Sequence, residues 1–371
     1  MKRLYKFIFP FLIALVLAAV LSLLPSCIFN PPPFDEGAWR SKVESADPAL
    51  LYSPHVKNGR FFNPWMPNEE RGFRRFLRWR FSSDPREYTK KEKAYRPGII
   101  GNAKERILAT PRGDFIMWIG HGTFLIRLQG EYWLTDPIFS ERAFLPKRKT
   151  PPGITLEALK EIAPKVNVII SHNHYDHLDK RTLLGLPEST RIFVPLGLKA
   201  YVQSLGKKNV TEMDWWQSIA GKNGLTLVCL PSQHWSRRIG QGSNETLWAS
   251  FMLITPKVTL YYGGDTGYFI GHREIGKRYP GIDYALLPTT AYHPRWFMHN
   301  AHMNIDETIE AFKDLKARCM VPHQWGTFHL GNEPVGYPAL ELQKTIARRG
   351  LDPSRFMIMN IGEIHKIPTS Q

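Results

Sequence analysis

A dense group of metal-binding side chains lies near the middle of the chain. Residues 171–179 read Ser-His-Asn-His-Tyr-Asp-His-Leu-Asp and directly follow the apolar, strand-like run Val166 to Ile170. Three imidazoles and one carboxylate lie within six residues of this segment, at His172, His174, Asp176 and His177. Imidazole and carboxylate suit zinc and similar divalent metals. Because a strand that ends in a loop can direct several side chains into one cavity, the segment predicts a metal site.

The surrounding pattern indicates layered α/β structure. From Phe115 onwards, strand-like runs alternate with turns, and the first three runs predict an antiparallel meander over residues 114–135. Further strands are expected at Val166–Ile170, Arg191–Val194, Leu225–Leu230, Leu247–Ile254, Val258–Tyr262 and Tyr284–Leu287. A helix is expected after Asn304, whose side chain can cap it. The alternation of strands with helical segments predicts two sheets.

The segment 172–177 resembles the HxHxDH signature of the metallo-β-lactamase superfamily. The resemblance implies an α/β fold, the αββα sandwich in which helices flank two mixed sheets, with metals at one edge. It implies that His172 and His174 bind one metal ion and that Asp176 and His177 bind a second. Two zinc ions per chain are the expected cofactors, and iron or manganese are the alternatives.

The same family pattern requires three downstream ligands. His234 follows a strand and matches the third ligand of the first metal. Asp265 also follows a strand, after two glycines that let the backbone bend close to the site, and it matches the bridging carboxylate. The last ligand is ambiguous, because the family histidine directly precedes an aromatic-Gly-Thr-Phe tetrad and Gln324 occupies that place here. Either His323 still reaches the metal, or the second site has lost a ligand.

Three further residues have two interpretations each. Asp136 ends a strand and either accepts the free N–H of a metal-bound histidine or caps the turn before Pro137. His121 is either a buried structural residue or a substrate contact, and its replacement by alanine is expected to leave the metal content intact. His302 matches a family position near the substrate phosphate, or it is a loop residue without a role. The expected catalytic residues are Asp176, Asp265 and His302.

Additional segments resemble the N-acylphosphatidylethanolamine phospholipase D branch of this superfamily, from Gly59 to Ile367. They include residues 59–65, 118–123, 134–139, 214–216, 274–278 and 292–298. This resemblance assigns a hydrolase domain to residues 59–367 and implies a phospholipase D-type phosphodiesterase that releases an N-acylethanolamine and phosphatidic acid. The chain is also similar to the ascorbate-6-phosphate lactonase group, which makes a soluble phosphorylated lactone or phosphoester an alternative substrate. A metal-binding envelope protein without turnover is a third hypothesis.

Composition restricts the partners. The formal net charge is +16, and 43% of the residues are hydrophobic, which is ample for a buried core. The charge favours anionic partners, and a phospholipid membrane with a lipid substrate is the expected one. Nucleic acid is not expected, because zinc-finger spacing and basic low-complexity tails are absent from the sequence. The sequence leaves the oligomeric state open, and Cys229 and Cys319 are expected to be buried thiols, although a single disulfide between them stays possible.

The N-terminal residues predict export. Basic residues among the first six precede an apolar run from Phe7 to Leu24, and the run ends in Leu-Pro-Ser-Cys, which resembles a lipobox with Cys27 as the lipidated residue. An uncleaved membrane anchor and simple secretion are the alternatives. Residues 28–58 are expected to be a linker and N-terminal extension. The leader and the lipidated Cys27 together predict a membrane-tethered enzyme at the bacterial cell envelope that faces the periplasm or the exterior. The basic, aromatic segment Arg71 to Phe81 is either a helix packed on the main domain or a lipid-headgroup surface.

Overall fold

The computed structural model describes residues 31, 33–67, 72–82, 86–110 and 113–368. The chain forms two compact units, one from residues 1–35 and 70–87 and the other from residues 36–69 and 88–371. In the first unit, the described helix is α4 (Phe73–Phe81), whose nine residues include four arginines and no acidic residue. The second unit contains both sheets and every described residue that was predicted to bind metal.

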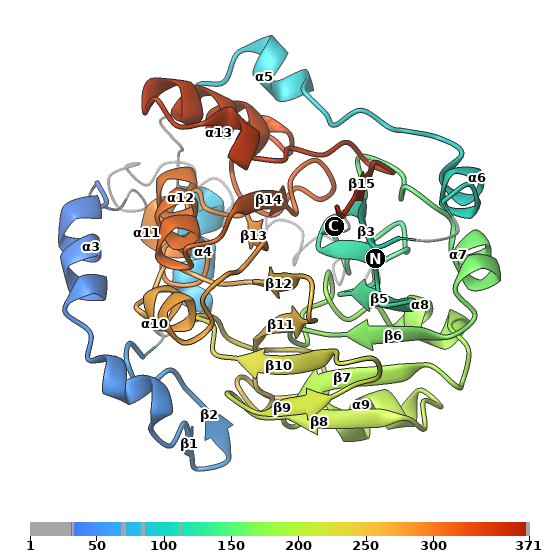
Figure 1. Ribbon diagram of the computed structural model, residues 1–371. Coiled ribbons are helices and arrows are strands. Elements are labelled where there is room, and N and C mark those ends of the chain that lie inside the picture. Colours follow the sequence, from blue (N-terminus) through green and yellow to red (C-terminus); the bar gives the residue numbers. More distant parts are fainter. Residues whose placement is uncertain (1–30, 32, 68–71, 83–85, 111–112, 369–371) are drawn as a thin grey trace, which may run out of the picture. The chain divides into compact units, whose positions relative to one another are not determined.

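A seven-stranded mixed sheet forms one layer of the second unit (Figure 1). Its strands, in spatial order, are β15 (Ile364–Lys366), β3 (Phe115–Gly120), β4 (Thr123–Leu128), β5 (Glu131–Thr135), β6 (Val166–Ile169), β7 (Arg191–Pro195) and β8 (Val210–Met213). The strands from β15 to β5 run antiparallel, whereas those from β5 to β8 run parallel. The predicted antiparallel meander is therefore confirmed as β3, β4 and β5.

A six-stranded mixed sheet forms the second layer. Its strands, in spatial order, are β14 (Cys319–His323), β13 (Tyr284–Pro288), β12 (Thr259–Tyr262), β11 (Ser250–Ile254), β10 (Thr226–Leu230) and β9 (Ser218–Ala220). The strands β9 to β12 are antiparallel, and β12 to β14 are parallel. Each of the strands predicted from the sequence between residues 166 and 287 corresponds to a strand in one of these two sheets.

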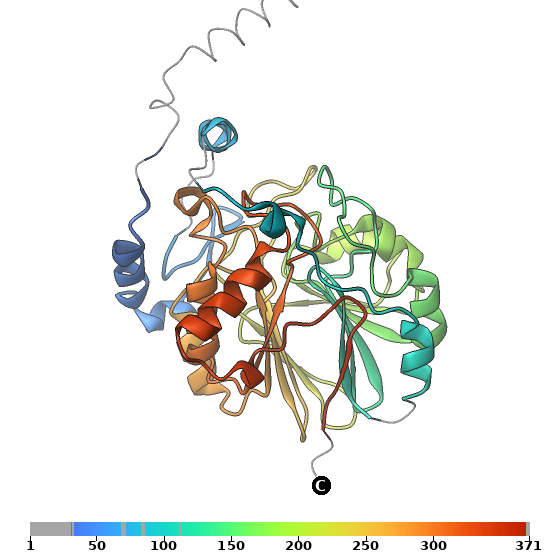
Figure 2. The same ribbon diagram turned by 90° about the horizontal axis from the view of Figure 1, so that it is seen from above.

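Helices cover the outer faces of the two sheets, which lie face to face in Figure 2. One group is α6 (Ala103–Leu108), α7 (Leu156–Ile162), α8 (Lys180–Gly185) and α9 (Lys199–Ser204), and the other is α10 (Gly271–Arg278), α11 (Arg295–Met298), α12 (Ile305–Asp314) and α13 (Tyr337–Arg348). Alternate residues of β3, including Phe115 and Met117, pack in one core cluster with Leu159 of α7 and Leu183 of α8. Every residue of β3 and β4 is buried, because both faces of the sheet are covered. The predicted αββα sandwich is confirmed.

The N-terminal part of the second unit is tied to α11 and α12. Helix α3 (Glu36–Glu44) places the Trp39 indole N–H 2.8 Å from Glu307, and Arg295 forms ion pairs with both Glu36 and Glu307. The predicted cap of α12 is present as a capping box, in which Asn304 accepts from the backbone N–H of Glu307 and Glu307 accepts from that of Asn304. The segment expected to be a linker and extension therefore includes a helix that packs on the hydrolase fold.

The remaining described elements are short. They are the 3₁₀ helices Pro48–Tyr52 and Pro353–Arg355, the helix α5 (Lys90–Ala94) and the hairpin of β1 (Val56–Lys57) with β2 (Arg60–Phe61). Cys229 is buried and Cys319 is half-buried, and both are free thiols, so they do not form a disulfide. Within the described residues, none of the helices has the length and apolar character needed to cross a membrane. The predicted leader and Cys27 lie outside the described residues.

Candidate metal centre

Except for His323, which ends β14, the predicted ligands lie in loops that begin where strands end. The segment His172 to His177 follows β6, His234 follows β10, and Asp265 follows β12. Each loop leaves a buried strand, so the strand fixes where the loop begins. The fold thereby brings together residues that are separated by up to 93 positions in the sequence.

The first cluster consists of His172, His174, His234 and Asp265, whose potential ligand atoms all lie within 4.8 Å of one another. His174 Nδ1 lies 2.7 Å from His172 Nε2 and 3.2 Å from His234 Nε2. Asp265 Oδ2 lies 3.8 Å from His172 Nε2 and 3.4 Å from His234 Nε2. The structure therefore brings together the four side chains that the family pattern assigned to the first metal.

Neighbouring acceptors orient two rings of this first cluster. His172 Nδ1 lies 2.9 Å from the Ser171 hydroxyl oxygen, and His234 Nδ1 lies 3.1 Å from the Ala301 carbonyl oxygen. A ring whose Nδ1–H donates to such an acceptor keeps a lone pair on Nε2. Metal-binding histidines are generally held in this way. His172 and His234 therefore direct Nε2 into the first cluster, where it can bind a metal.

The second cluster consists of His121, Asp176 and His177. Asp176 Oδ2 lies 2.9 Å from His121 Nε2 and 3.3 Å from His177 Nε2. Asp265 faces this cluster too, because its Oδ1 lies 3.2 Å from His177 Nε2 while its Oδ2 faces the first cluster. One carboxylate thus lies between the two clusters, as the family pattern expects of the bridging aspartate.

Asp136 lies behind the second cluster and orients its histidine. Its Oδ2 lies 2.6 Å from His177 Nδ1 and also accepts the Tyr262 hydroxyl at 2.6 Å, and its Oδ1 accepts the backbone N–H of Ser171 at 2.6 Å. These contacts agree with the interpretation of Asp136 as the acceptor that fixes the tautomer of a metal-bound histidine. The turn-cap alternative accounts for none of them.

Two glycines allow the close packing around Asp136. A side chain at Gly122 would place its Cβ 2.8 Å from the Tyr262 hydroxyl. A side chain at Gly264, whose φ is +58°, would place its Cβ 2.6 Å from Ser171 Cβ. The glycine before Asp265 is therefore needed for the close approach that the sequence predicted.

His323 and Gln324 point to different surroundings. Among the described residues, His323 belongs to neither cluster, and its ring stacks on Tyr262 and meets Phe124 edge-on. Neither ring nitrogen makes a regular hydrogen bond, although the backbone of Leu286 lies near the ring. The Gln324 amide donates to Asp265 Oδ1 instead. The structure therefore does not place His323 in the second cluster, which was one of the two alternatives that the sequence left open. Strand β14 ends at His323, and Gln324, with a φ of +74°, reaches Asp265 from the turn that follows.

His302 lies beside the first cluster. Its ring is half-buried and meets the His234 ring at a centroid distance of 5.3 Å. Its position between α11 and α12 is held by the backbone, since its N–H donates to the Met298 carbonyl and its own carbonyl accepts from Arg295. A half-buried imidazole at this position can contact a substrate that binds at the first cluster.

The charges of the centre suit divalent cations. Burial lowers the pKa of His172 well below its usual value and that of His174 to about 4, so both rings are neutral. Burial would also lower the pKa of His177, but Asp265, Asp176 and Asp136 raise it well above its usual value. Three carboxylates around one imidazole concentrate negative charge that a cation neutralises. The donor set of imidazole and carboxylate therefore fits a pair of divalent metal ions.

One member of the second cluster was not predicted as a ligand. His121 lies in the turn between β3 and β4, 55 positions before Asp176, and the sequence assigned it either a structural or a substrate role. The sequence feature that could have indicated a ligand is the two-residue turn between two buried strands, which consists of a histidine and a glycine. The contact itself depends on tertiary packing, which the spacing in the sequence does not show.

Comparison with known proteins identifies the family of the chain. The beta-lactamase superfamily domain model matches residues 132–325. N-acyl-phosphatidylethanolamine-hydrolyzing phospholipase D 1 of Caenorhabditis elegans is 36% identical over 271 residues, which cover 68% of this chain and 75% of that protein. The mitochondrial N-acyl-phosphatidylethanolamine-hydrolyzing phospholipase D of Saccharomyces cerevisiae is 36% identical over 243 residues, which cover 61% of this chain and 50% of that protein.

A solved structure of a possible metal-dependent hydrolase from Veillonella parvula superposes with a TM-score of 0.58 and covers 69% of this chain and 100% of its own. At 16% identity this similarity shows the shared fold alone. The family model spans every member of the two clusters except His121, which precedes the matched residues. The chain therefore belongs to the metallo-β-lactamase superfamily, in its N-acylphosphatidylethanolamine phospholipase D-like branch, and is a metal-dependent hydrolase by family.

Proposed function

We propose that this hydrolase is a phospholipase D-type phosphodiesterase that uses two zinc ions. Its substrate would be N-acylphosphatidylethanolamine, and its products N-acylethanolamine and phosphatidic acid. The observation that carries the proposal is the pair of clusters on either side of Asp265, which agrees with two-metal hydrolysis of a phosphodiester. The worm and yeast relatives are named for hydrolysis of N-acylphosphatidylethanolamine, which supports the choice of lipid.

The chain supplies the groups that such a reaction needs. When bound, a pair of metal ions supplies Lewis-acid activation of water and of the phosphoryl group. Asp265, between the clusters, can accept the proton of the attacking water, and Asp176 would help to hold the second metal ion near it. A P–O bond to the water oxygen forms as the P–O bond to the ethanolamine oxygen breaks. His302 beside the first cluster can give the leaving oxygen its proton.

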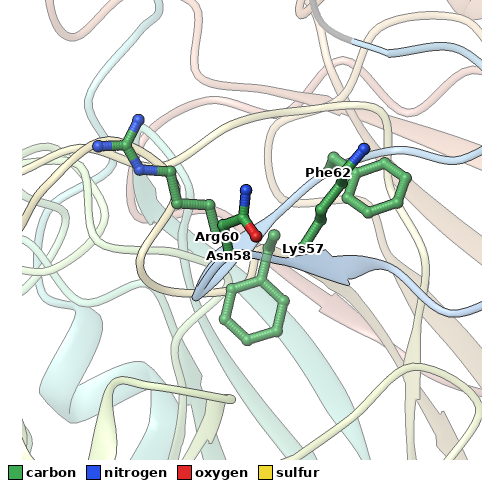
Figure 3. A pocket seen from close by; sticks show the side chains of 5 residues that line it. Lys57, Asn58, Arg60 and Phe62 are labelled. Atoms are coloured by element: carbon green, nitrogen blue, oxygen red, sulfur yellow. The ribbon is translucent and has the colours of Figure 1, made fainter.

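A pocket at the β1–β2 hairpin offers basic and aromatic groups that suit an anionic lipid. The pocket has a volume of about 520 Å³ and is lined by the β1–β2 hairpin and the residue after it, with Lys57, Asn58, Arg60, Phe61 and Phe62 (Figure 3). Figure 3 shows the Lys57 amino group beside the Phe62 ring, with Arg60 extending to the other side. Asn63, the next residue, donates to the His234 carbonyl at 3.1 Å. Basic and aromatic groups thus lie on a segment that contacts a metal-binding loop.

The same proposal includes a location at the bacterial cell envelope. The apolar leader with Cys27 favours a lipoprotein that is tethered to a membrane, and the four arginines of α4 favour an anionic lipid surface. Replacement of Cys27 by serine tests the tether, because it should abolish incorporation of labelled fatty acid and release the protein from the membrane fraction. Incorporation that persists in this variant would exclude lipidation at Cys27.

The experiment for the activity is an assay of the purified full chain on N-acylphosphatidylethanolamine in mixed micelles, with metal content measured on the same sample. We expect release of N-acylethanolamine that chelation abolishes and zinc restores. A phosphorylated lactone and a small soluble phosphodiester are assayed in parallel. Turnover of either soluble compound without turnover of the lipid would replace the proposal with the soluble-substrate alternative.

Variants of the pocket test the lipid specificity separately. Lys57→Ala and Arg60→Ala should raise KM for the anionic lipid several-fold and leave hydrolysis of a small soluble phosphodiester unchanged. Lys208→Ala, which removes a lysine from an exposed pair with Glu188, is the matched control and should change neither. Equal effects on both substrates would show that the hairpin supports the fold rather than the lipid.

A further inference from the structure

We propose that His121 is a ligand of the second metal ion, in the place that the family pattern gives to a histidine at position 324. This inference rests on the two-metal site of the proposed function, but not on the identity of the substrate. It reverses the expectation that loss of the His121 side chain would leave the metal content intact. It also assigns Gln324 a positioning role at Asp265 instead of a metal-binding one.

The turn between β3 and β4 holds His121 in one position. Its backbone has a φ of +52°, which is uncommon for a residue other than glycine, and its side chain is fully buried. The backbone N–H donates to the Thr327 hydroxyl at 2.9 Å, and the carbonyl accepts from the Trp118 indole at 2.8 Å and from the Gln324 N–H at 3.1 Å. Non-glycine residues in this conformation are concentrated at functional sites.

The hydrogen-bonding surroundings of the His121 ring indicate a cation. Its Nδ1 lies 3.4 Å from the Gln324 carbonyl oxygen, and its Nε2 lies 2.9 Å from Asp176 Oδ2. A neutral imidazole has one N–H and one lone pair, so it can donate to only one of these two acceptors. When Nδ1–H points to the carbonyl, the Nε2 lone pair faces a carboxylate oxygen. A metal ion shared by His121 and Asp176 removes that repulsion.

The arrangement at His121 repeats the one at the other candidate ligands. His172, His177 and His234 each direct Nδ1 to an oxygen acceptor and Nε2 to a cluster. His121 follows the same rule, with the Gln324 carbonyl as the acceptor. His323 does not, because neither of its ring nitrogens makes a regular hydrogen bond. The pattern that identifies metal-bound histidines thus selects His121 and leaves out His323.

The test compares metal binding by the full-length wild-type protein with that of two variants. His121→Gly removes the imidazole and suits the positive φ, and His323→Leu removes the neighbouring histidine. Each apoprotein is titrated with Zn²⁺ by calorimetry, and with Co²⁺ while its visible spectrum is recorded. We expect wild type and His323→Leu to bind two equivalents. We expect His121→Gly to bind the first equivalent normally and the second at least about tenfold more weakly, with an altered Co²⁺ spectrum for that equivalent.

His272→Ala is the matched control for loss of a buried histidine, because His272 is buried in α10 and belongs to neither cluster of the described residues. Retention of the first equivalent shows that His121→Gly is folded, and cooperative thermal unfolding checks this independently. Unchanged affinity and spectrum for the second equivalent in His121→Gly would overturn the proposal. So would loss of that equivalent in His323→Leu. Neither readout depends on turnover, so failure of the lipid assay leaves this test intact.

Discussion

The two clusters of the metal centre differ in charge and in how their histidines are held. The first combines three imidazoles with Asp265, and His172 and His234 are oriented by a hydroxyl and a carbonyl. The second combines two imidazoles with Asp176 and one oxygen of the same Asp265, and the carboxylate of Asp136 orients His177. The first cluster therefore has more imidazole ligands, and the second has more carboxylate around it.

This difference predicts unequal metal preferences. Imidazole suits zinc, copper, iron and nickel, whereas carboxylate favours harder ions such as manganese. The first cluster should therefore hold zinc firmly, and the second should exchange its ion more readily.

The largest effect is expected where the clusters share a residue. In Asp265→Asn, the carboxylate that faces both clusters becomes an amide, so both metal positions should weaken together. We expect kcat/KM to fall at least about a thousandfold, which is about 4 kcal/mol. Metal analysis of the dialysed variant checks the cause. Two retained metals and full rate would show that Asp265 does not join the clusters.

Replacement of Asp136 is expected to weaken binding of the second metal more than binding of the first. The variant Asp136→Asn removes the negative charge that holds the His177 ring through Nδ1, so the second metal should bind about 10–100-fold more weakly. The first metal should change less, because Asp136 reaches His172 only through the Ser171 hydroxyl. Separate Kd values from calorimetric titration measure the asymmetry. Equal loss at both positions would mean that the centre responds as one unit.

Sequence and structure agree wherever a local pattern determines the outcome. The strand Val166–Ile169 and the cap at Asn304 follow from apolar runs and capping chemistry within a few residues. The four members of the first cluster were assigned through the family resemblance, in which His172 and His174 share one short motif and His234 and Asp265 match family positions that follow strands. Tertiary geometry decides the second cluster. His121 lies in a turn 55 positions before Asp176, and the spacing of the two residues in the sequence does not predict their contact.

The ambiguity at positions 323 and 324 has a different physical origin. Both residues are polar and adjacent at the end of β14, and only the orientation of each side chain separates them. Strand β14 ends at His323 and Gln324 has a φ of +74°, so the direction of the Gln324 side chain depends on the turn that follows the strand. The sequence could therefore name the pair but not decide which of the two faces Asp265.

Replacement of Gln324 is expected to weaken binding of the second metal only modestly. Its amide donates to the Asp265 oxygen that faces the second cluster, so Gln324→Ala removes a hydrogen bond without removing a ligand. A net contribution of about 1 kcal/mol corresponds to about fivefold in the Kd of the second metal. Titration with Mn²⁺ and Zn²⁺ in parallel measures this change. A complete loss of the second metal would indicate that Gln324 is itself a ligand.

The smallest effect is expected at His323, although it lies beside Gln324. Its ring is fully buried against Tyr262 and Phe124, and burial lowers its pKa to about 3, so the ring is neutral. Neither nitrogen makes a regular hydrogen bond, so an apolar side chain of similar size relieves a desolvation cost instead of breaking an interaction. His323→Leu should therefore keep both metals and be as stable as wild type or up to about 1 kcal/mol more stable. Urea unfolding of the metal-free proteins measures this directly. If the free energy of unfolding of His323→Leu were instead several kcal/mol lower than that of wild type, the imidazole would make a stabilising interaction in the core.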